Sequence, residues 1–239
     1  MMAFGNQIVC TACLSEVSRP AVQRANNLRD YMDARRHSKA ILAAGIPERF
    51  IDADFSNFVA QDARANRLRD VMYAYTQDFD NQRQLRPGFL FIGNPGTGKS
   101  HLSCAIAQEL ICQGRTAVYE SLSSLTVRIR HSYDDDATES TDSIIKTLVN
   151  VDFLILDEID LHGASDTDYI NLFEIINGRW ERKNAPTLAC SNRPLDRLNR
   201  DLDERITSRI LAGFPPMVFD WENYRDTLPA QLKAARPKA

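Results

Sequence analysis

Residues 89–100 read FLFIGNPGTGKS, and this stretch decides the fold of the chain. The apolar run Phe89–Ile92 predicts a strand, and the segment from His101 to Gln113 predicts the helix that follows it. Between them, residues 93–100 match G-x-x-x-x-G-K-[ST], a phosphate-binding loop in its strand–loop–helix context. The alternative is a glycine turn before an ordinary helix. We favour the phosphate loop, because glycines let backbone N–H groups turn toward a polyphosphate and a helix N-terminus adds donors and partial positive charge.

Separate residues of this loop have separate expected roles. Lys99 is expected to reach the β- and γ-phosphates, and the Ser100 hydroxyl is expected to bind Mg²⁺. The residues predicted to contact the nucleotide are Gly93, Asn94, Pro95, Gly96, Thr97, Gly98, Lys99, Ser100 and His101.

The composition is that of an ordinary globular protein, with 239 residues, 44% hydrophobic and 26% charged. A net charge of −3 excludes a globally basic nucleic-acid binder, so any DNA contact needs a local basic track. The odd cysteine count, with Cys104, Cys112 and Cys190 in apolar, core-like positions, predicts reduced thiols inside the cell. Neither a membrane span nor a signal peptide is evident, and we expect a cytoplasmic protein without a membrane partner.

From residue 87 onward, predicted strands and helices alternate. The expected strands are 89–92, 116–119, 152–157, 187–191 and 217–220, and the expected helices are 101–113, 122–131, 142–149, 167–183 and about 202–211. Such alternation predicts a parallel sheet covered on both faces. The expected fold class is therefore α/β, with three layers around a central parallel sheet.

The first 45 residues differ in character from the rest. Cys10 and Cys13 form a C-x-x-C pair, and a basic helix is expected over about 21–43. Tetrahedral zinc needs four ligands, and His37 is the only other local candidate, so a surface cysteine pair is the favoured alternative to a zinc site. The basic helix is either a solvated face or a docking surface. The expected divisions are 1–45 (docking segment), 46–87 (linker and a helix at about 62–80), 88–226 (nucleotide-binding domain) and 227–239 (tail).

Polar residues follow two of the predicted central strands. Asp157 and Glu158 end the strand 152–157, and Asn192 follows the strand 187–191. Ligands of open α/β sheets bind at the carboxyl ends of the strands, where the phosphate loop also lies. Each motif alone is often an ordinary turn. Together with the phosphate loop they predict Mg²⁺ binding by Asp157, activation of the attacking water by Glu158, and orientation of that water by Asn192.

The motifs GNPGTGKS, FLILDEID, ACSN, DERITSRI and FDWENYR, in this order, resemble the DnaC-type branch of the AAA+ ATPases, the bacterial and phage helicase loaders. The resemblance covers about residues 45–226. It implies an ASCE-type P-loop core, ATP as the nucleotide, no C-terminal helical lid and a small helical N-terminal extension.

The resemblance also implies roles for residues outside the core motifs. By motif position, Arg209 resembles an arginine finger that acts on ATP bound by a neighbouring subunit, and Arg225 resembles a second sensor arginine. Alternatively, Arg205 and Arg209 belong to a solvated helix face. Positions resembling single-stranded DNA contacts are Arg130, Tyr133, Thr167 and Tyr169, and an aromatic ring beside basic residues makes a stacking platform. The segment from Asp157 to Tyr169 is slightly longer than in the loaders, so the resemblance does not fix the register of Thr167 and Tyr169.

The expected function is therefore that of an ATPase, weak alone and dependent on assembly, that places a replicative DnaB-type helicase on single-stranded DNA. The resemblance implies self-association through the ATP site, and hydrolysis would release the loader. One alternative is an IstB-like transposition helper that binds duplex DNA and a transposase. Others are a nucleotide-gated adaptor that hardly hydrolyses ATP and, least favoured, a P-loop kinase.

Overall fold

The computed structural model describes residues 2–4, 7–9, 39–85, 87–160, 165–202 and 204–227. The chain divides into two compact units, Met1–Leu42 and Ala43–Ala239. In the first unit, strands β1 (Met2–Phe4) and β2 (Gln7–Val9) pair antiparallel. The helix expected over 21–43 is described only for residues 39–43, which are helical. Cys10, Cys13 and the predicted tail from residue 228 lie outside the described residues.

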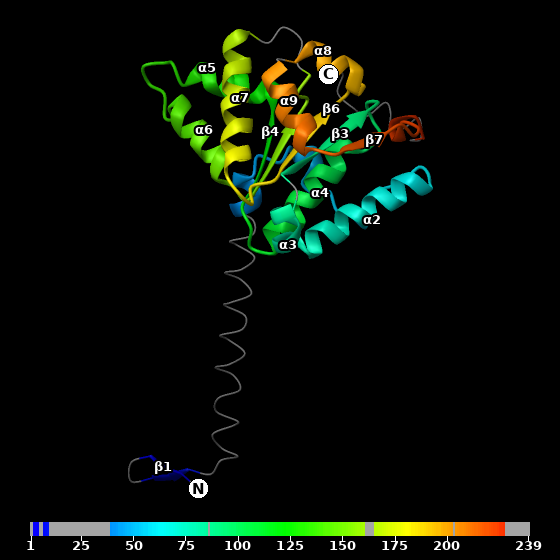
Figure 1. The fold of residues 1–239 in the computed structure, drawn as a ribbon. Coiled ribbons are helices and arrows are strands. Elements are labelled where there is room, and N and C mark those ends of the chain that lie inside the picture. The colour runs from blue at the N-terminus through cyan, green and yellow to red at the C-terminus, as the bar shows by residue number, and fades with distance from the viewer. Residues whose placement is uncertain are drawn as a thin grey trace. The chain divides into compact units, whose positions relative to one another are not determined.

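The second unit is built on a five-stranded parallel sheet (Figure 1). Its strands lie in the order β4-β5-β6-β3-β7, and each neighbouring pair is parallel. Parallel neighbours need crossover connections, which place helices on the faces of the sheet. The predicted fold class is thus confirmed. The strands are β3 (Gly88–Gly93), β4 (Ala117–Ser121), β5 (Phe153–Asp157), β6 (Thr187–Ser191) and β7 (Pro216–Phe219).

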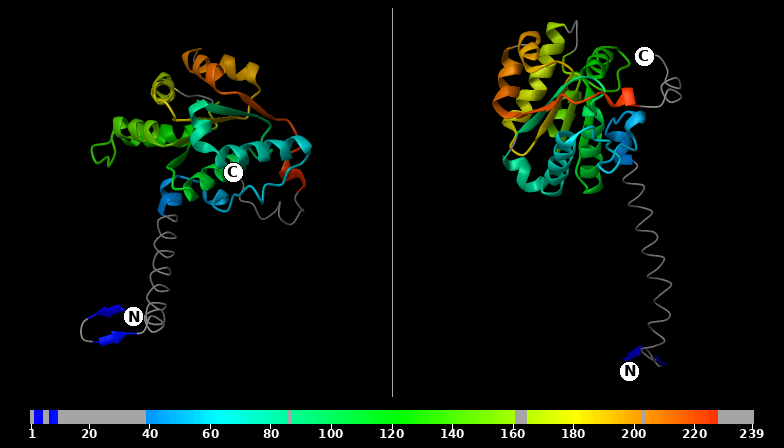
Figure 2. Two further views of the ribbon diagram at one scale, coloured as in Figure 1. Left: turned by 60° about the horizontal axis from the view of Figure 1, so that its bottom comes forward. Right: turned by 90° about the vertical axis from the view of Figure 1, so that its right-hand side faces the viewer.

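Helices cover both faces of this sheet (Figure 2). One face carries α4 (Lys99–Cys112), with α2 (Ala63–Gln77) and α3 (Phe79–Leu85) beside it. The other face carries α5 (Leu122–His131), α6 (Thr141–Asn150), α7 (Asp166–Glu181), α8 (Leu195–Asp201) and α9 (Glu204–Gly213). The short helices η1 (Glu48–Phe50) and α10 (Tyr224–Thr227) lie before and after these elements in the chain.

The core is divided by the sheet into two layers. Along β3, Leu90 packs with the α5–α9 layer, whereas Phe89 contacts Tyr75 of α2. Along β5, Leu154 likewise packs with the α5–α9 layer, whereas Phe153 contacts Phe79 of α3 on the opposite face. Successive side chains of a strand point to opposite faces. Because both faces are covered, both sets are apolar, which is why the strand sequences read as continuous hydrophobic runs.

Three expectations about local structure were wrong. The helix expected over 62–80 is two helices, separated at Asp78, whose backbone leaves the helical region and whose carboxylate accepts from Asn81 and Gln82. Helix α8 was missed because Asn192-Arg193-Pro194 looks like a turn, whereas Pro194 is the N-cap. Cys112, expected in the core, is exposed at the C-terminal end of α4. Cys104 and Cys190 are buried as expected.

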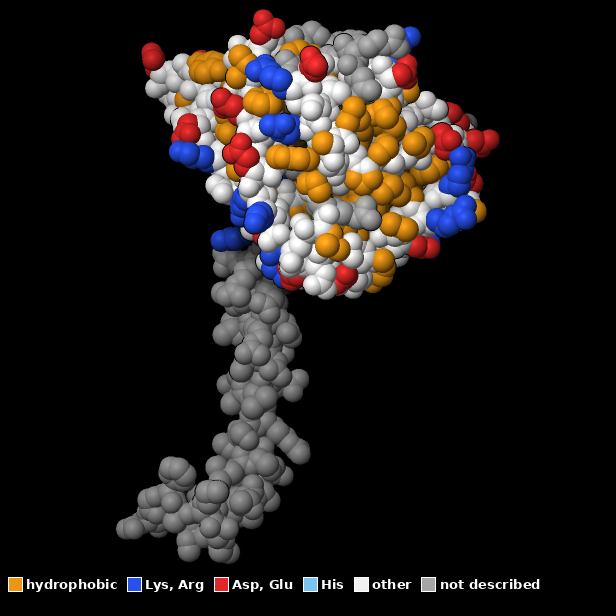
Figure 3. Space-filling view, in the orientation of Figure 1, with side chains coloured by type: hydrophobic (Ala, Val, Ile, Leu, Met, Phe, Trp, Pro, Cys, Tyr) orange, Lys and Arg blue, Asp and Glu red, His pale blue; other side chains and the backbone are white. Residues whose placement is uncertain are grey.

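Among the strands that the structure describes, β7 pairs only with β3 and is an edge strand of the sheet. Val218 on this strand is 53% exposed, and Leu211 at the end of α9 is 42% exposed. Hydrophobic side chains gather over β7 and between α9 and α2 (Figure 3). Within the described ranges, no helix combines the length and hydropathy that a membrane crossing requires.

Candidate functional site

The loop between β3 and α4 leaves the N-terminus of α4 without a side-chain cap. Ser121, Ser140 and Ser165 cap α5, α6 and α7 through their hydroxyl oxygens. The N-cap of α4 is Gly98, whose φ of 95° lies in the left-handed region and which has no side chain to accept the first amides. In the described part of the chain, no side chain caps these N–H groups, so they and the positive end of the helix are available at the point where a phosphate would bind.

Lys99 is held at the base of this loop. Its side chain is buried, and Nζ donates to the carbonyl oxygens of Gly93 at 2.7 Å and Asn94 at 2.8 Å. Burial lowers the pKa of Lys99 from its usual value. The nearby charges of Asp157 and Asp160 offset this effect only in part, so an incoming polyphosphate would add counter-charge to the buried ammonium.

Ser100 and Asp157 come together although they are far apart in the sequence. Ser100 Oγ donates to Asp157 Oδ2 at 2.7 Å, and Asp157 is only 4% exposed. A second hydroxyl, that of Tyr119, donates to the same oxygen at 2.5 Å, and the backbone N–H of Glu158 donates to Oδ1 at 2.9 Å. Burial, the largest effect, and the neighbouring Asp157 raise the pKa of Tyr119, so its phenol stays protonated. A hydroxyl beside a carboxylate is a hard-oxygen donor set that fits Mg²⁺.

Glu158 is exposed at the carboxyl end of β5, in an uncommon backbone conformation. Its φ is 54°, which is rare for a residue with a side chain. Strain of this kind is usually found at functional sites, where the surroundings hold it in place. Here the next residue is fixed, because the N–H of Ile159 donates to the Cys190 carbonyl oxygen on β6 at 3.0 Å.

Asn192 is exposed just beyond β6, and its N–H donates to Asp160 Oδ1 at 3.3 Å. Asp160 also pairs with Arg193, with 3.7 Å between Oδ2 and Nε. Asp160, which we did not predict, therefore links the loops that carry Glu158 and Asn192. The sequence did not indicate this role, because Asp160 belongs to no motif or periodic pattern that distinguishes it from other surface carboxylates.

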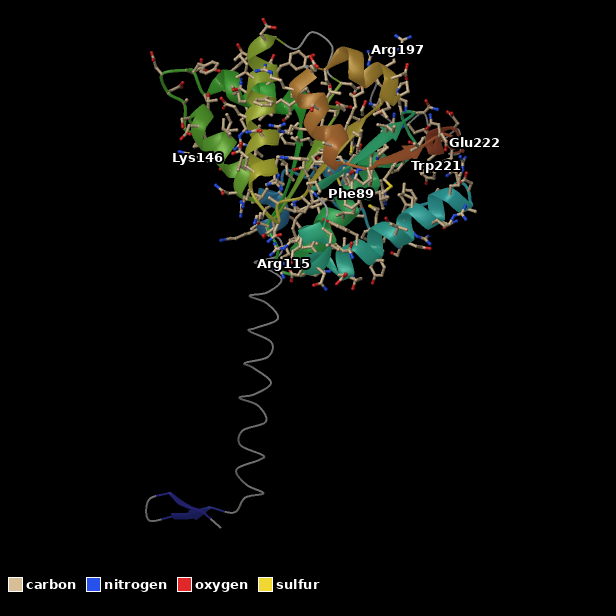
Figure 4. The ribbon with its side chains drawn as sticks, viewed as in Figure 1. Phe89, Arg115, Lys146, Arg197, Trp221 and Glu222 are labelled. Atoms are coloured by element: carbon tan, nitrogen blue, oxygen red, sulfur yellow. The ribbon has the colours of Figure 1, made fainter. Side chains whose placement is uncertain are left out.

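The segment after β7 packs on the phosphate loop. Trp221 Nε1 donates to the Thr97 carbonyl oxygen at 2.8 Å, and the N–H of Tyr224 donates to that of Gly96 at 3.0 Å. Trp221 is buried just beyond β7 (Figure 4), and its ring lies tilted at 44° against that of Phe219, with 4.8 Å between ring centroids. A side chain at Gly96 would collide with Asn223, since an added Cβ would lie 1.8 Å from its Oδ1. Residues 221–224 therefore shape the loop, a role that sequence reasoning missed.

The lead-in before α2 contacts the other side of the loop. The Phe58 ring lies against Gly98 and makes an edge contact with His101, with 5.7 Å between ring centroids. His101 Nε2 lies 3.2 Å from the Asp54 carbonyl oxygen. The predicted loop residues are thus enclosed by two segments from distant parts of the chain.

A family model described as "IstB-like ATP binding protein" matches residues 22–213. This match spans well over half of the 239-residue chain. The chain belongs to this family. Membership agrees with the resemblance to the DnaC- and IstB-like AAA+ ATPases, and it supports ATP as the nucleotide of the site described above.

Named relatives and solved structures agree with this assignment. The "Replicative helicase loader DnaC" of Escherichia coli (strain K12) is 27% identical to this IstB-like protein over 194 residues, or 80% of this chain and 77% of that protein. The crystal structure of the DnaC helicase loader superposes with a TM-score of 0.63 at 22% identity, covering 72% of this chain and 99% of that one. The structure of AMPPCP-bound DnaA from Aquifex aeolicus gives a TM-score of 0.61 at 20% identity. The match covers 79% of this chain and 56% of that one. The structural likenesses show a shared fold.

Two arginines of this IstB-like protein had predicted roles on the nucleotide. Arg225 is exposed and directly follows the segment that packs on the phosphate loop. Its charge adds to the larger effect of burial in lowering the pKa of Lys99. Arg209 lies on α9 and donates from Nε to Asn177 Oδ1 on α7 at 3.2 Å. The guanidinium of Arg205 lies over the Phe173 ring of α7, 5.1 Å from its centroid. Both α9 arginines thus contact α7.

The residues predicted to contact DNA lie on α5 and α7 of the IstB-like domain. Arg130 Nη2 lies 3.5 Å from Oδ2 of the buried Asp168, the residue between Thr167 and Tyr169, so these positions come together. Tyr133 is 61% exposed, and Thr167 is exposed. Tyr169 is half-buried and packs against the core. The aromatic surface available for stacking in this region is therefore mainly that of Tyr133.

Proposed function

We propose that this protein is an ATP-dependent loader of a replicative, hexameric DnaB-type helicase. The proposal is carried by one observation, the hydrogen bond between Ser100 and the buried Asp157, which joins the phosphate loop to the acidic end of β5. Relatives named replicative helicase loader support the choice of partner. In this reading the N-terminal segment 1–45 docks on the helicase, the domain 88–226 binds ATP, 46–87 links them, and 227–239 is a tail.

The residues around the site divide the work of hydrolysis between them. Ser100 and Asp157 would hold Mg²⁺, which when bound neutralises phosphate charge. Lys99 binds the phosphates, Glu158 takes a proton from the attacking water, and Asn192 orients that water. Arg225 would contact the phosphates of its own subunit. Arg209, which packs on α7, acts on ATP held by an adjoining copy. Hydrolysis is slow in the isolated chain and rises on assembly.

The DNA contacts belong to the same proposal. Arg130, Tyr133, Thr167 and Tyr169 would line the path of single-stranded DNA, with the exposed Tyr133 as the stacking residue. Loading then couples ATP binding to a grip on the strand, and hydrolysis releases the loader.

Docking on the helicase can be tested by charge reversal in the basic N-terminal segment. Arg35→Glu combined with Arg36→Glu is expected to weaken binding to the replicative helicase by about 1–3 kcal/mol, because rim charges act through complementary fields. The measurement is co-purification and titration with the helicase. The control is Lys146→Glu, which reverses the charge of an α6 lysine whose side chain is 68% exposed. This variant should bind the helicase as the unchanged protein does. Undiminished binding by the double variant would overturn the docking role of residues 1–45.

The proposal that Arg209 acts on ATP held by a neighbouring copy can be tested by mixing two inactive variants. Arg209→Ala is expected to lower hydrolysis at least about 10³-fold in the presence of helicase and single-stranded DNA, because an arginine finger neutralises transition-state charge. Mixing Arg209→Ala chains with Glu158→Gln chains should restore part of the activity, since the second chain supplies an intact Arg209 to the first. Arg197→Ala, on the exposed surface of α8 (Figure 4), is the control. Normal hydrolysis by Arg209→Ala, or no recovery on mixing, contradicts the assignment.

The second candidate is a transposition helper that binds duplex DNA and a transposase. It is favoured by the family description, IstB-like ATP binding protein. Competition between duplex and single-stranded oligonucleotides in the presence of ATP separates the two. Preference for the duplex, together with no binding to the replicative helicase, would favour the transposition helper.

A further inference from the structure

Tyr119 lies on β4, beside the strand that carries Asp157. The two strands are parallel, with Tyr119 opposite Ile155 and Ser121 opposite Asp157. Tyr119 is only 7% exposed, and its hydroxyl donates to Asp157 Oδ2 at 2.5 Å. Ser100 Oγ donates to the same oxygen at 2.7 Å. One carboxylate oxygen thus receives hydrogen bonds from two elements, β4 and α4.

The backbone of Tyr119 is itself fixed by a third segment. Its N–H donates to the Ala44 carbonyl oxygen at 2.7 Å. Gly45 has a φ of 67° and lies so close that an added Cβ would be 2.7 Å from the Tyr119 carbonyl oxygen. The phenol therefore has little freedom to leave Asp157, because both its ring and its backbone are packed.

This arrangement determines which way Asp157 points. The N–H of Glu158 holds Oδ1, whereas Oδ2 is directed at Ser100 by the two hydroxyls. A carboxylate that serves a metal site depends on such outer hydrogen bonds for its orientation. Of the two hydroxyls that the described residues place on Oδ2, removal of the phenol would leave that of Ser100, the residue whose oxygen the metal itself must reach.

We propose that Tyr119 is a positioning residue of the magnesium–nucleotide site, whose hydroxyl keeps Asp157 Oδ2 directed at Ser100. It touches neither nucleotide nor metal and acts through Asp157. The inference rests on the proposed ATPase function. The inference extends that function, because it assigns a role to a residue of β4 that lies outside every phosphate-loop motif.

The test is ATP binding by Tyr119→Phe, measured by calorimetry in EDTA and across a series of Mg²⁺ concentrations. The Mg²⁺ concentration for half-maximal enhancement of ATP binding should rise about tenfold. Affinity for ATP in EDTA should stay within about twofold, because Lys99 and the loop amides are unchanged. Tyr75→Phe is the matched control, a buried tyrosine of α2 that packs on Phe89, and should keep the normal Mg²⁺ dependence.

Each outcome bears on the inference. If Tyr119→Phe lowers the unfolding temperature but keeps the normal Mg²⁺ dependence, its role is only structural and the inference is wrong. A tenfold shift with an unchanged EDTA affinity supports it. If the unchanged protein binds no ATP at any Mg²⁺ concentration, the proposed function fails first, and this inference fails with it.

Discussion

Glu158→Gln is expected to lower ATP hydrolysis by about 10²- to 10⁴-fold while ATP still binds, because general-base catalysis typically contributes this much. The substitution keeps the shape of the side chain but removes the group that takes the proton from water. Lys99, Ser100 and Asp157 stay in place, so affinity for ATP should change little. Two measurements on the same preparation, in the presence of helicase and single-stranded DNA, check this prediction. Single-turnover kinetics give the hydrolysis rate, and equilibrium binding gives the affinity for ATP.

Glu174→Gln is the control for this experiment. Glu174 is an exposed carboxylate on α7 and has no predicted role in the site. The Glu174→Gln variant should hydrolyse ATP at the normal rate. If Glu158→Gln also does so, another group activates the water, and the assignment of Glu158 is wrong. A loss of ATP binding in Glu158→Gln would mean that the residue supports the loop rather than the chemistry.

Arg179→Met is expected to destabilise the fold by about 3 kcal/mol or more, because it removes five hydrogen bonds that the guanidinium donates to buried and partly buried oxygens. Arg179 on α7 is 2% exposed. Nη1 donates to the carbonyl oxygens of Leu148, Val149 and Val151 at 2.8–3.1 Å, where α6 ends. Nε donates to Thr187 Oγ1 and Nη2 to the Pro186 carbonyl oxygen, both at 2.7 Å.

Burial lowers the pKa of Arg179 to about 9, and the surrounding oxygens stabilise the cation that remains at neutral pH. Arg179 thereby ties the end of α6 to the start of β6. Arg182→Met is the matched control, since Arg182 is an exposed arginine that also donates to the Val149 carbonyl oxygen. It should cost about 1 kcal/mol or less. Denaturant unfolding of the two variants gives the comparison, and equal losses would contradict the role of burial.

The local patterns of the sequence were sufficient for most of the fold. All the expected strands of the sheet are present within a few residues of their predicted ends, because a strand buried on both faces reads as a short apolar run. The phosphate loop was predictable because glycine, lysine and serine each meet a separate local requirement at fixed spacing. Errors arose where a short element depended on one side chain, as at Asp78 and Pro194.

Corrections also arose where a residue's surroundings come from elsewhere in the chain. Cys112 has the apolar neighbours of a core residue in sequence, yet it faces solvent because α4 ends there. Tyr169, a predicted DNA contact, is partly buried against the core, which no local pattern in the sequence indicates, whereas Tyr133 is 61% exposed.

By itself, the sequence determined the parallel α/β sheet, the phosphate loop and the acidic end of β5, because periodicity and spacing act over short stretches of chain. Only the tertiary structure decided that Tyr119 shares Asp157 with Ser100, that Trp221 contacts the Thr97 carbonyl oxygen, and that Arg179 serves the end of α6. A hydrogen bond between distant residues leaves no repeating pattern in the sequence. It follows from which side chains the folded sheet brings within about 3 Å of one another.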